Sequence, residues 1–240
     1  MKLIVIGSSS KGNGYALISS SNEILLLEAG VKARKMIKAI DYASSQVVGC
    51  LASHAHQDHA GQLKDYAKYG FLIAANEDVL SKKSIPQHQK YPIEEGKTYQ
   101  FGRFKVSPFN VKHDVPTLGF LIRHEECGSI LFATDCAHLP YVFKNVNHFI
   151  IEANYSDDIL EERIIKGEES IYRKRRLLST HMEISQTIKS IEKCNPDKAK
   201  TITLIHLSAD NGDPVMFHRE VARKFGIPTY IAKPNVVINL

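Results

Sequence analysis

The hydrophobic positions of this chain fall into short apolar runs that alternate with amphipathic segments. Runs of about four to eight apolar residues bounded by Gly, Asn or Ser are typical of buried strands, whereas apolar positions about three to four residues apart indicate helices. The apolar runs predict strands at residues 3–6, 15–19, 23–27, 47–52, 71–74, 99–101, 104–111, 118–123, 129–133, 149–151, 201–205, 229–231 and 236–238. The amphipathic segments predict helices at 32–40, after 63, at 76–82, twice between 157 and 178, at 184–194 and at 213–225. Such an alternation of strands and helices predicts an α/β fold.

Local signals mark several ends of these elements. Asn76 can cap the helix that follows it, and Asp213 before Pro214 is a good start for the last helix, which should stop at Gly226. Residues 84–97 contain two prolines and mixed charge, and we expect them to form a surface excursion.

Length and composition suit one globular domain. A chain of 240 residues with 43% hydrophobic residues can bury a sizeable core, and we expect residues 1–240 to form a single domain. The formal net charge of +5 permits an anionic substrate but is too small to require a nucleic acid. We find no internal repeat that would indicate a solenoid.

The cysteines and the chain start bear on the compartment. The four cysteines, Cys50, Cys127, Cys136 and Cys194, include no C-x-x-C pair, and residues 1–6 predict a strand rather than a secretory leader. We therefore expect free thiols and a cytoplasmic protein. No stretch approaches the roughly 18 apolar residues of a membrane span, so we expect a soluble protein with no membrane partner.

The largest cluster of potential metal ligands follows the predicted strand at 47–52. Residues 54–59 are His-Ala-His-Gln-Asp-His. Imidazole nitrogens and carboxylate oxygens bind zinc, manganese and iron, and alternate side chains of an extended segment point to different sides. One loop can therefore serve two metal ions. The alternative is a polar loop with three solvated histidines, which the clustering of four potential ligands disfavours.

Further polar side chains stand at later strand ends. His113 follows the strand at 104–111. A lone histidine there is usually structural, but the upstream metal loop makes it a candidate ligand. Asp135 follows the strand at 129–133, where a carboxylate is often only a helix cap; here it is our candidate to bridge two cations. Glu28, at another strand end, could orient a ligand without binding metal itself.

Two segments could contact an anion. Residues 7–14 form a turn rich in glycine and serine, which could offer backbone N–H groups, although a plain hairpin connection explains them equally well. Residues 172–176, Tyr-Arg-Lys-Arg-Arg, hold the densest positive charge of the chain. A solvated helix face is the default for such a run, and phosphate binding is the alternative because Thr180-His181 follows closely.

The set formed by residues 54–59, His113, Asp135 and His206 resembles the metallo-β-lactamase superfamily over nearly the whole chain. The resemblance implies a four-layer αββα sandwich with a dimetal site at one edge of its two sheets. His54, His56 and His113 would bind the first metal, Asp58, His59 and His206 the second, and Asp135 would bridge. True β-lactamases carry cysteine at the position of Asp135, which argues against lactam hydrolysis.

Within the superfamily, three stretches resemble ribonuclease Z and its relative, the YycJ-type (WalJ) nuclease branch: residues 7–13, 152–155 and 180–182. Residues 206–211 are most similar to the YycJ-type branch. The family usually has aspartate where this chain has Glu28, and serine or leucine where Met182 stands. The long flexible arm with which ribonuclease Z grips transfer RNA is not apparent in this sequence.

The resemblance implies a hydrolase with two divalent metal ions, zinc being favoured and manganese or iron the alternatives. We expect a phosphodiesterase or nuclease acting on DNA or RNA, in which a metal-bridging hydroxide attacks phosphorus. Asp58 would orient this water or accept its proton, His181 would protonate the leaving group, and Glu152 would hold the His181 imidazole. The expected partner is a nucleic acid or another phosphodiester, and a homodimer is left open.

Two other functions are compatible with the sequence. Glyoxalase-like thioesterases and lactonases use the same seven ligands, so the substrate class is not decided by them. A metal-stabilised scaffold without catalysis is the second alternative, which the intact ligand set disfavours.

Overall fold

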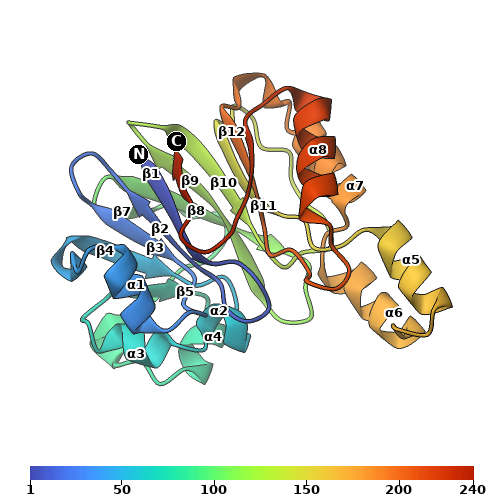
Figure 1. Ribbon diagram of the computed structural model, residues 1–240. Helices are drawn as coiled ribbons and strands as arrows, with labels where there is room; N and C mark the ends of the chain where they lie inside the picture. Colours follow the sequence, from blue (N-terminus) through green and yellow to red (C-terminus); the bar gives the residue numbers. More distant parts are fainter.

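The computed structural model describes residues 1–240 and contains two β-sheets with helices on their outer sides (Figure 1). The first seven-stranded sheet has the spatial order β14 (Val237–Asn239), β1 (Lys2–Gly7), β2 (Gly14–Ile18), β3 (Ile24–Leu27), β4 (Val47–Leu51), β5 (Ile73–Ala75) and β6 (Lys90–Pro92). The second seven-stranded sheet has the order β13 (Thr229–Ile231), β12 (Thr201–Ile205), β11 (His148–Glu152), β10 (Gly128–Ala133), β9 (Thr117–His124), β8 (Phe104–Val111) and β7 (Tyr99–Phe101).

Both sheets are mixed. In the first, β3 to β6 run parallel, while β14, β1, β2 and β3 pair antiparallel. In the second, β10 to β13 run parallel, while β7 to β10 pair antiparallel. The central parallel strands are buried on both faces, as continuous apolar sequences such as β11 and β12 require. Their carboxyl ends lie together, and ligand sites of open α/β sheets form there.

The two sheets stack on a shared apolar core. Leu3, Leu25 and Leu51 of the first sheet pack in one cluster with Phe120 and Phe132 of the second. The inward side of each strand is apolar because side chains alternate between the two faces. Burial of these side chains, at roughly 25 cal/mol per Å² of apolar surface, holds the sheets together.

Helices cover the outer faces and complete four layers. Four helices precede the second sheet in sequence: α1 (Ala33–Ala39), α2 (Gln57–Ala60), α3 (Leu63–Ala67) and α4 (Glu77–Lys82). All four contribute apolar side chains to a cluster on the outer face of the first sheet. Helices α7 (Ile184–Lys193) and α8 (Pro214–Phe225) do the same for the second sheet. The α/β fold expected from the sequence is confirmed.

Helices α5 (Asp157–Ile165) and α6 (Ile171–Thr180) form a lobe at one end of the molecule (Figure 1). Their apolar contact with the body is a small cluster of Tyr155, Leu160 and Leu177 with Ile164 beside it. Polar contacts add to it, among them the ion pair between Arg176 and Asp114. Short 3-10 turns complete the elements at Ser44–Gln46, Gln87–Gln89 and Pro196–Lys198. No helix has the length and apolar character needed to cross a bilayer.

The expected helix ends agree with the structure. The Asn76 side chain accepts a hydrogen bond from the Val79 N–H at the start of α4, and Asp213 caps α8 in the same way. Gly226 ends α8 with a φ of 66°, a conformation that costs glycine little. The surface excursion expected at residues 84–97 is partly wrong, because residues 90–92 pair with β5 as the edge strand β6. Pro92 hid this strand, since proline is tolerated only at sheet edges.

Candidate metal centre

The site lies where strand ends of both sheets meet. The loop after β4 presents His54 and His56, and the single turn α2 presents Asp58 and His59. His113 follows β8, while Asp135 and His206 follow β10 and β12. The structure thus brings the seven candidate metal ligands together, in two groups that share Asp135 and in each of which the potential ligand atoms lie within 4.8 Å of one another.

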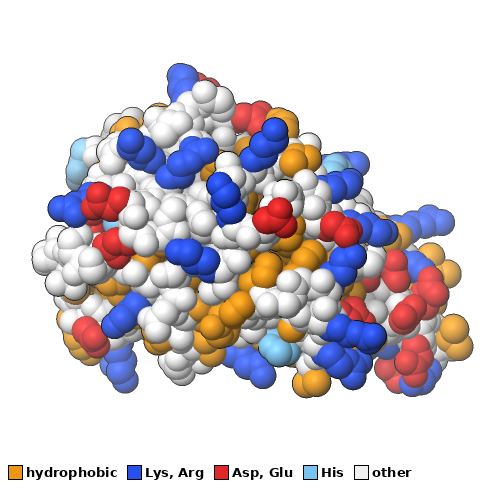
Figure 2. Space-filling model, turned by 90° about the horizontal axis from the view of Figure 1, so that it is seen from above, with side chains coloured by type: hydrophobic (Ala, Val, Ile, Leu, Met, Phe, Trp, Pro, Cys, Tyr) orange, Lys and Arg blue, Asp and Glu red, His pale blue; other side chains and the backbone are white.

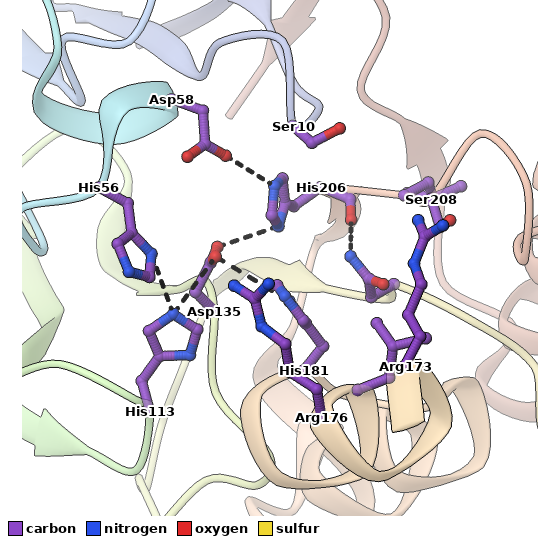
Figure 3. Close-up of a pocket in the computed structure, with 13 residues that line it drawn as sticks. Ser10, His56, Asp58, His113, Asp135, Arg173, Arg176, His181, His206 and Ser208 are labelled. Atoms are coloured by element: carbon purple, nitrogen blue, oxygen red, sulfur yellow. Dashed lines mark hydrogen bonds and ion pairs between the residues drawn. The ribbon is translucent and has the colours of Figure 1, made fainter. Parts of the chain in front are cut away.

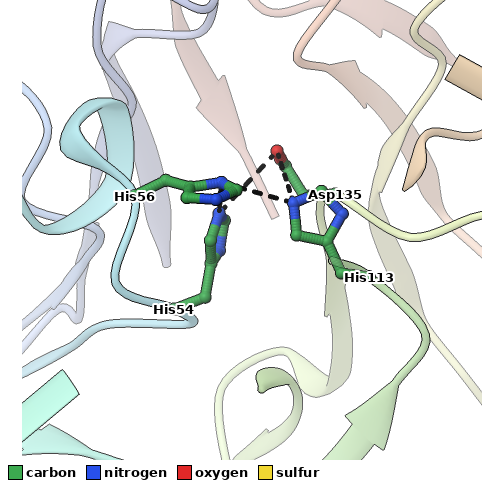
Figure 4. Close-up of side chains that lie close together, drawn as sticks. All are labelled: His54, His56, His113 and Asp135. Atoms are coloured by element: carbon green, nitrogen blue, oxygen red, sulfur yellow. Dashed lines mark hydrogen bonds and ion pairs between the residues drawn. The ribbon is translucent and has the colours of Figure 1, made fainter. Parts of the chain in front are cut away.

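The first group consists of three imidazoles and one carboxylate oxygen (Figure 4). The Nδ1 atom of His56 lies 3.1 Å from the Nε2 atom of His54 and 3.4 Å from the Nε2 atom of His113. The Oδ2 atom of Asp135 lies 3.9 Å from the His54 Nε2 atom and 3.8 Å from the His113 Nε2 atom. Four ligand atoms therefore face a common point, as a metal ion requires.

The second group uses the other oxygen of Asp135. Its Oδ1 atom lies 3.1 Å from the Nε2 atom of His59 and 2.9 Å from the Nδ1 atom of His206. The Oδ2 atom of Asp58 lies 3.3 Å from the His59 Nε2 atom and 3.4 Å from the His206 Nε2 atom. Because the two oxygens of Asp135 face different groups, this side chain has the geometry of a bridge.

Hydrogen bonds behind the imidazoles orient the first group. The Nδ1 atom of His113 lies 2.8 Å from the Thr180 carbonyl oxygen, so it must carry the proton, and Nε2 is left as an acceptor. The Nδ1 atom of His54 lies 2.8 Å from the Ser53 Oγ atom. Burial lowers the pKa of both His54 and His113, which keeps them in the neutral form that binds metals.

The second group concentrates negative charge. Burial alone would raise the pKa of Asp135, but His206 and His59 hold it well below its usual range. Burial likewise opposes the shift at Asp58, yet the neighbouring His206 and His59 imidazoles lower its pKa. The pKa values of His59 and His206 are raised against the effect of burial, chiefly by Asp135. A divalent cation can neutralise these carboxylates in place of the two protons.

One buried atom tests whether the residues fit a metal. The Nε2 atom of His206 is buried without a hydrogen-bond partner, and it points toward Asp58 across the second group. Such an orphaned atom is costly unless something binds it. Nitrogen and oxygen donors alone line both groups, a set that suits zinc, manganese or iron. The residues therefore fit metal ions.

Backbone strain is concentrated at the site. Glu28, Asp135 and His206 have positive φ angles of 65°, 43° and 54°. Each of them lies one or two residues after the end of a strand, so the left-handed conformation turns the chain sharply as it leaves the sheet. Non-glycine residues with such angles cost about 1–3 kcal/mol each and persist where the surrounding structure holds them. Glu28 is fully buried, and its Oε2 atom lies 3.5 Å from the His59 Nδ1 atom, so it can orient that ring.

A third group lies next to the second and contains His181, the expected general acid, and Glu152, which is expected to position it. The Nδ1 atom of His181 lies 2.7 Å from the Oε1 atom of Glu152, which also lies 3.1 Å from the His206 Nδ1 atom. The other Glu152 oxygen accepts hydrogen bonds from the backbone N–H groups of Cys136 and Met182. Burial would lower the pKa of His181, but Glu152 raises it. Glu152 thus fixes the ring and favours its protonated form.

Several site residues were missed in the sequence. The Nδ2 atom of Asn13 lies 3.0 Å from the His59 Nε2 atom, and the Ser8 Oγ atom accepts the backbone N–H of His206. Both belong to the turn at residues 7–14, so this turn supports metal-site residues. Asp114 Oδ1 lies 3.0 Å from the His113 Nε2 atom and 3.3 Å from the His56 Nε2 atom. Asp114 directly follows the candidate ligand His113 in the sequence, and this position could have marked it as a site residue.

A pocket of about 230 Å³ opens over the site (Figure 3). His56, Asp58, His113, Asp135, His181 and His206 line its inner part, and helix α6 contributes Arg173, Arg176 and Leu177 to its wall. The basic run is therefore divided. Two of its arginines line the pocket, whereas Lys174 pairs with Glu161 of α5 at 2.8 Å. Guanidinium groups above a cluster of metal ligands can bind an anionic substrate.

The family follows from the sequence as well as from this geometry. A model of the beta-lactamase superfamily domain matches residues 26–207. The chain belongs to the metallo-beta-lactamase superfamily. It is thus a metallo-beta-lactamase-fold hydrolase with candidate metal-binding residues. Comparison with curated protein sequences finds no match.

Solved members of the metallo-beta-lactamase fold are similar along the whole chain. The fold protein YhfI from Bacillus subtilis is 17% identical with a TM-score of 0.77, over 99% of this chain and 98% of YhfI. Zinc-bound PqqB from Methylobacterium extorquens is 15% identical with a TM-score of 0.72, over 100% of both chains. Human tRNase Z, short form, is 15% identical with a TM-score of 0.69, over 100% of this chain and 99% of that one. At these identities the similarities concern the fold.

Proposed function

We propose that this protein is a metal-dependent phosphodiesterase that cleaves DNA or RNA, close to the YycJ-type nuclease branch. The observation that carries the proposal is the pocket wall, where Arg173 and Arg176 of α6 line the same pocket as the candidate metal ligands. A phosphodiester carries one negative charge and offers oxygens to both arginines. A neutral thioester or lactone carries no negative charge with which two permanently charged arginines could pair at this position.

The site residues divide into two candidate ligand sets. His54, His56 and His113 would hold one cation; Asp58, His59 and His206 would hold the other, with Asp135 shared. Two bound divalent cations would lower the pKa of a water toward neutrality and neutralise charge on the phosphoryl group. Zinc is our first choice, and manganese and iron are the alternatives, since all three accept nitrogen and oxygen ligands. The zinc-bound relative PqqB supports this choice through its fold.

Two groups of the protein would move protons. The Asp58 carboxylate, ionised because its pKa is lowered, can orient the attacking water and accept its proton. His181 donates its Nδ1 proton to Glu152 in a hydrogen bond and leaves its Nε2 proton available to a leaving oxygen. The raised pKa favours the protonated form of His181, which is the form that an acid for this step needs. Glu152 acts as the residue that positions His181.

The fold neighbours and the thiols agree with this assignment. Human tRNase Z shares the fold over the full chain, although fold alone does not decide a substrate. The four cysteines are free and buried, which suits the reducing cytoplasm where we place the protein.

A substrate panel tests the proposal. We would load the purified protein with zinc, manganese or iron in turn and measure turnover of bis-nitrophenyl phosphate, thioesters, lactones, and labelled single- and double-stranded DNA and RNA. We expect phosphodiester and nucleic-acid cleavage, which falls steeply as salt increases. Thioester or lactone turnover without phosphodiester turnover would overturn the proposal, and loss of all activity in every metal-loaded form would favour a scaffold.

Matched variants sharpen the panel. Arg173→Gln with Arg176→Gln should lower phosphodiester turnover while metal content stays the same. Arg34→Gln removes an exposed arginine of α1, on the far side of the first sheet, and should change neither quantity. Equal activity of the double variant and the control would remove the main support for a phosphodiester substrate.

A further inference from the structure

Helix α6 separates the pocket from a second depression. Arg173, Arg176 and Leu177 line the pocket, whereas Ile171, Lys174, Arg175 and Leu178 line a groove between α5 and α6. The groove has a volume of about 460 Å³. One helix therefore borders both depressions.

The groove combines an apolar floor with a charged edge, where Lys174 is paired with Glu161 of α5 and Arg175 is the unpaired cation. Ile165 is 86% exposed and Ile171 is 62% exposed, and both line the groove together with Leu178. Figure 2 shows hydrophobic side chains at the tip of this lobe, at the right, beside charged ones. Scattered exposed apolar residues are ordinary, but a contiguous group in a depression marks a binding surface.

The solvent side of α6 connects the two depressions. Residues three and four apart are neighbours on a helix surface, so Tyr172 lies beside both Arg175 and Arg176. Tyr172 is 83% exposed, and its ring packs against no other aromatic residue. Arg176 lines the pocket and Arg175 lines the groove, so the order across the helix is arginine, tyrosine, arginine.

The charges on α6 favour an anionic partner. The helix contains no acidic residue. Three cations of the basic run pair with carboxylates elsewhere: Arg173 with Glu169, Lys174 with Glu161 and Arg176 with Asp114. Arg175 makes no ion pair, although it is exposed. A second copy of the chain would have to bury this unpaired cation in an apolar contact, which is costly.

We propose that this face, Arg176, Tyr172 and Arg175 with the groove beyond, binds a single-stranded nucleic acid that continues from the pocket. The arginines would contact successive phosphates, Tyr172 would stack on an unpaired base, and the apolar floor would receive the next base. Basic side chains interleaved with aromatic ones are the usual design of single-strand binding surfaces. The proposal rests on the proposed phosphodiesterase function and adds a strand preference to it.

The test compares long and short substrates. We would measure kcat/KM of the metal-loaded protein for a single-stranded 12-mer, its duplex and bis-nitrophenyl phosphate, and oligonucleotide binding by fluorescence anisotropy, in wild type, Tyr172→Leu, Tyr172→Phe and Arg175→Gln. Tyr172→Leu should weaken single-strand binding about 5- to 150-fold, as loss of one stacked base does, while Tyr172→Phe keeps the stack. Arg175→Gln should reduce the salt slope by about 0.7, the value for one phosphate contact on a single strand.

Controls come from the opposite side of the molecule. Tyr42→Leu and Arg34→Gln also remove an exposed tyrosine and an exposed arginine, and neither should change the ratio of long-substrate to short-substrate kcat/KM. An unchanged ratio in Tyr172→Leu and Arg175→Gln overturns the strand surface, even if bis-nitrophenyl phosphate is still hydrolysed and the proposed function stands. If Ile165→Glu converts a dimer to a monomer while strand binding is unaffected, the face belongs to a second copy and the proposal is also overturned. Loss of every phosphodiesterase activity in wild type would instead remove the proposed function itself.

Discussion

At the scale of single residues, Asp135 is the side chain that connects the two ligand groups of the site. Its Oδ2 atom faces His54 and His113, and its Oδ1 atom faces His59 and His206. Asp135 has a strained φ of 43°, and the Thr134 hydroxyl helps to hold its side chain by donating a hydrogen bond to the Oδ1 atom at 2.7 Å. Removing this side chain therefore affects both ligand groups at once.

We expect Asp135→Ala to bind both metal ions less tightly, by more than about tenfold, because even residues behind the ligands contribute about 10- to 100-fold. The measurement is metal content per chain after dialysis against metal-free buffer. Asp65→Ala, at an exposed carboxylate paired with Lys68, is the control and should keep its metal. Full occupancy in Asp135→Ala would contradict the bridge.

Substitution of His181 should lower the catalytic rate without changing metal binding. Its Nδ1 atom is hydrogen bonded to Glu152, and it belongs to neither of the two proposed ligand sets. We expect His181→Ala to lose about a hundred- to ten-thousandfold in kcat while metal content stays the same, since that is the usual contribution of one general acid. Metal analysis alongside the kinetics distinguishes the roles: a variant that also loses metal would show that His181 is a ligand or a structural residue.

Site residues could be predicted from the sequence where several potential ligands stand close together in the chain. Residues that reach the site only through contacts in the folded protein could not. Residues 54–59 carry four potential ligands in a row, so their grouping was evident. Asn13 and Asp114 reach the site only through the folded path of their loops, and one amide or one carboxylate carries no comparable signal. The structure was needed to show which side of α6 faces the pocket, and hence that Arg173 and Arg176 line it whereas Lys174 does not.

At the scale of elements, strand ends position the site and helix caps define its surroundings. Helix α8 packs Phe217 and Val221 on the outer face of the second sheet, in one apolar cluster with Leu204 of β12, the strand that precedes His206. The Asp213 Oδ1 atom accepts hydrogen bonds from the N–H groups of Val215 and Met216, at 2.8 and 3.0 Å. Apolar periodicity and such caps are local signals, which is why most elements were predictable. The three-residue strand β6 was not, because its pairing with β5 is its only signal.

We expect Asp213→Ala to lower the free energy of unfolding by about 1 kcal/mol, the usual value of an N-cap. Urea unfolding followed by circular dichroism measures it. Glu220→Ala, an exposed position of the same helix, should stay within about 0.5 kcal/mol of wild type. Equal effects of the two substitutions would mean that the cap contributes nothing.

His148 on strand β11 should make stability sensitive to acid. It is fully buried, its Nδ1 atom lies 2.8 Å from the Thr201 Oγ1 atom, and burial lowers its pKa to about 4. Between about pH 6.5 and 4 the unfolded chain binds a proton that the folded chain does not, so stability falls as the pH decreases, by at most about 1.4 kcal/mol per pH unit. His148→Gln should flatten the stability curve over this interval, as measured by urea titrations at several pH values. Parallel curves for wild type and variant would rule out His148 as the cause.

At the scale of the whole molecule, the candidate metal centre joins the two sheets. Asp58 and His59 follow β4 of the first sheet, whereas Asp135 and His206 follow β10 and β12 of the second. Apolar contacts such as those of Leu25 and Phe132 hold the sheets together away from this edge. At the edge itself, carboxylates and imidazoles replace apolar contacts, and bound cations would offset the repulsion between the carboxylates and the cost of burying them.

Metal removal should therefore destabilise the entire fold and not only inactivate the site. At free metal one hundred times the dissociation constant, binding adds about 2.7 kcal/mol to the unfolding free energy. For a chain of this size that corresponds to a decrease of about 5–10 °C in Tm on addition of a chelator. Thermal unfolding of loaded and chelated protein measures it, and Asp135→Ala, which lacks the shared carboxylate, should respond much less. If loaded and chelated wild type unfold at the same temperature, the two sheets do not depend on an ion at their common edge.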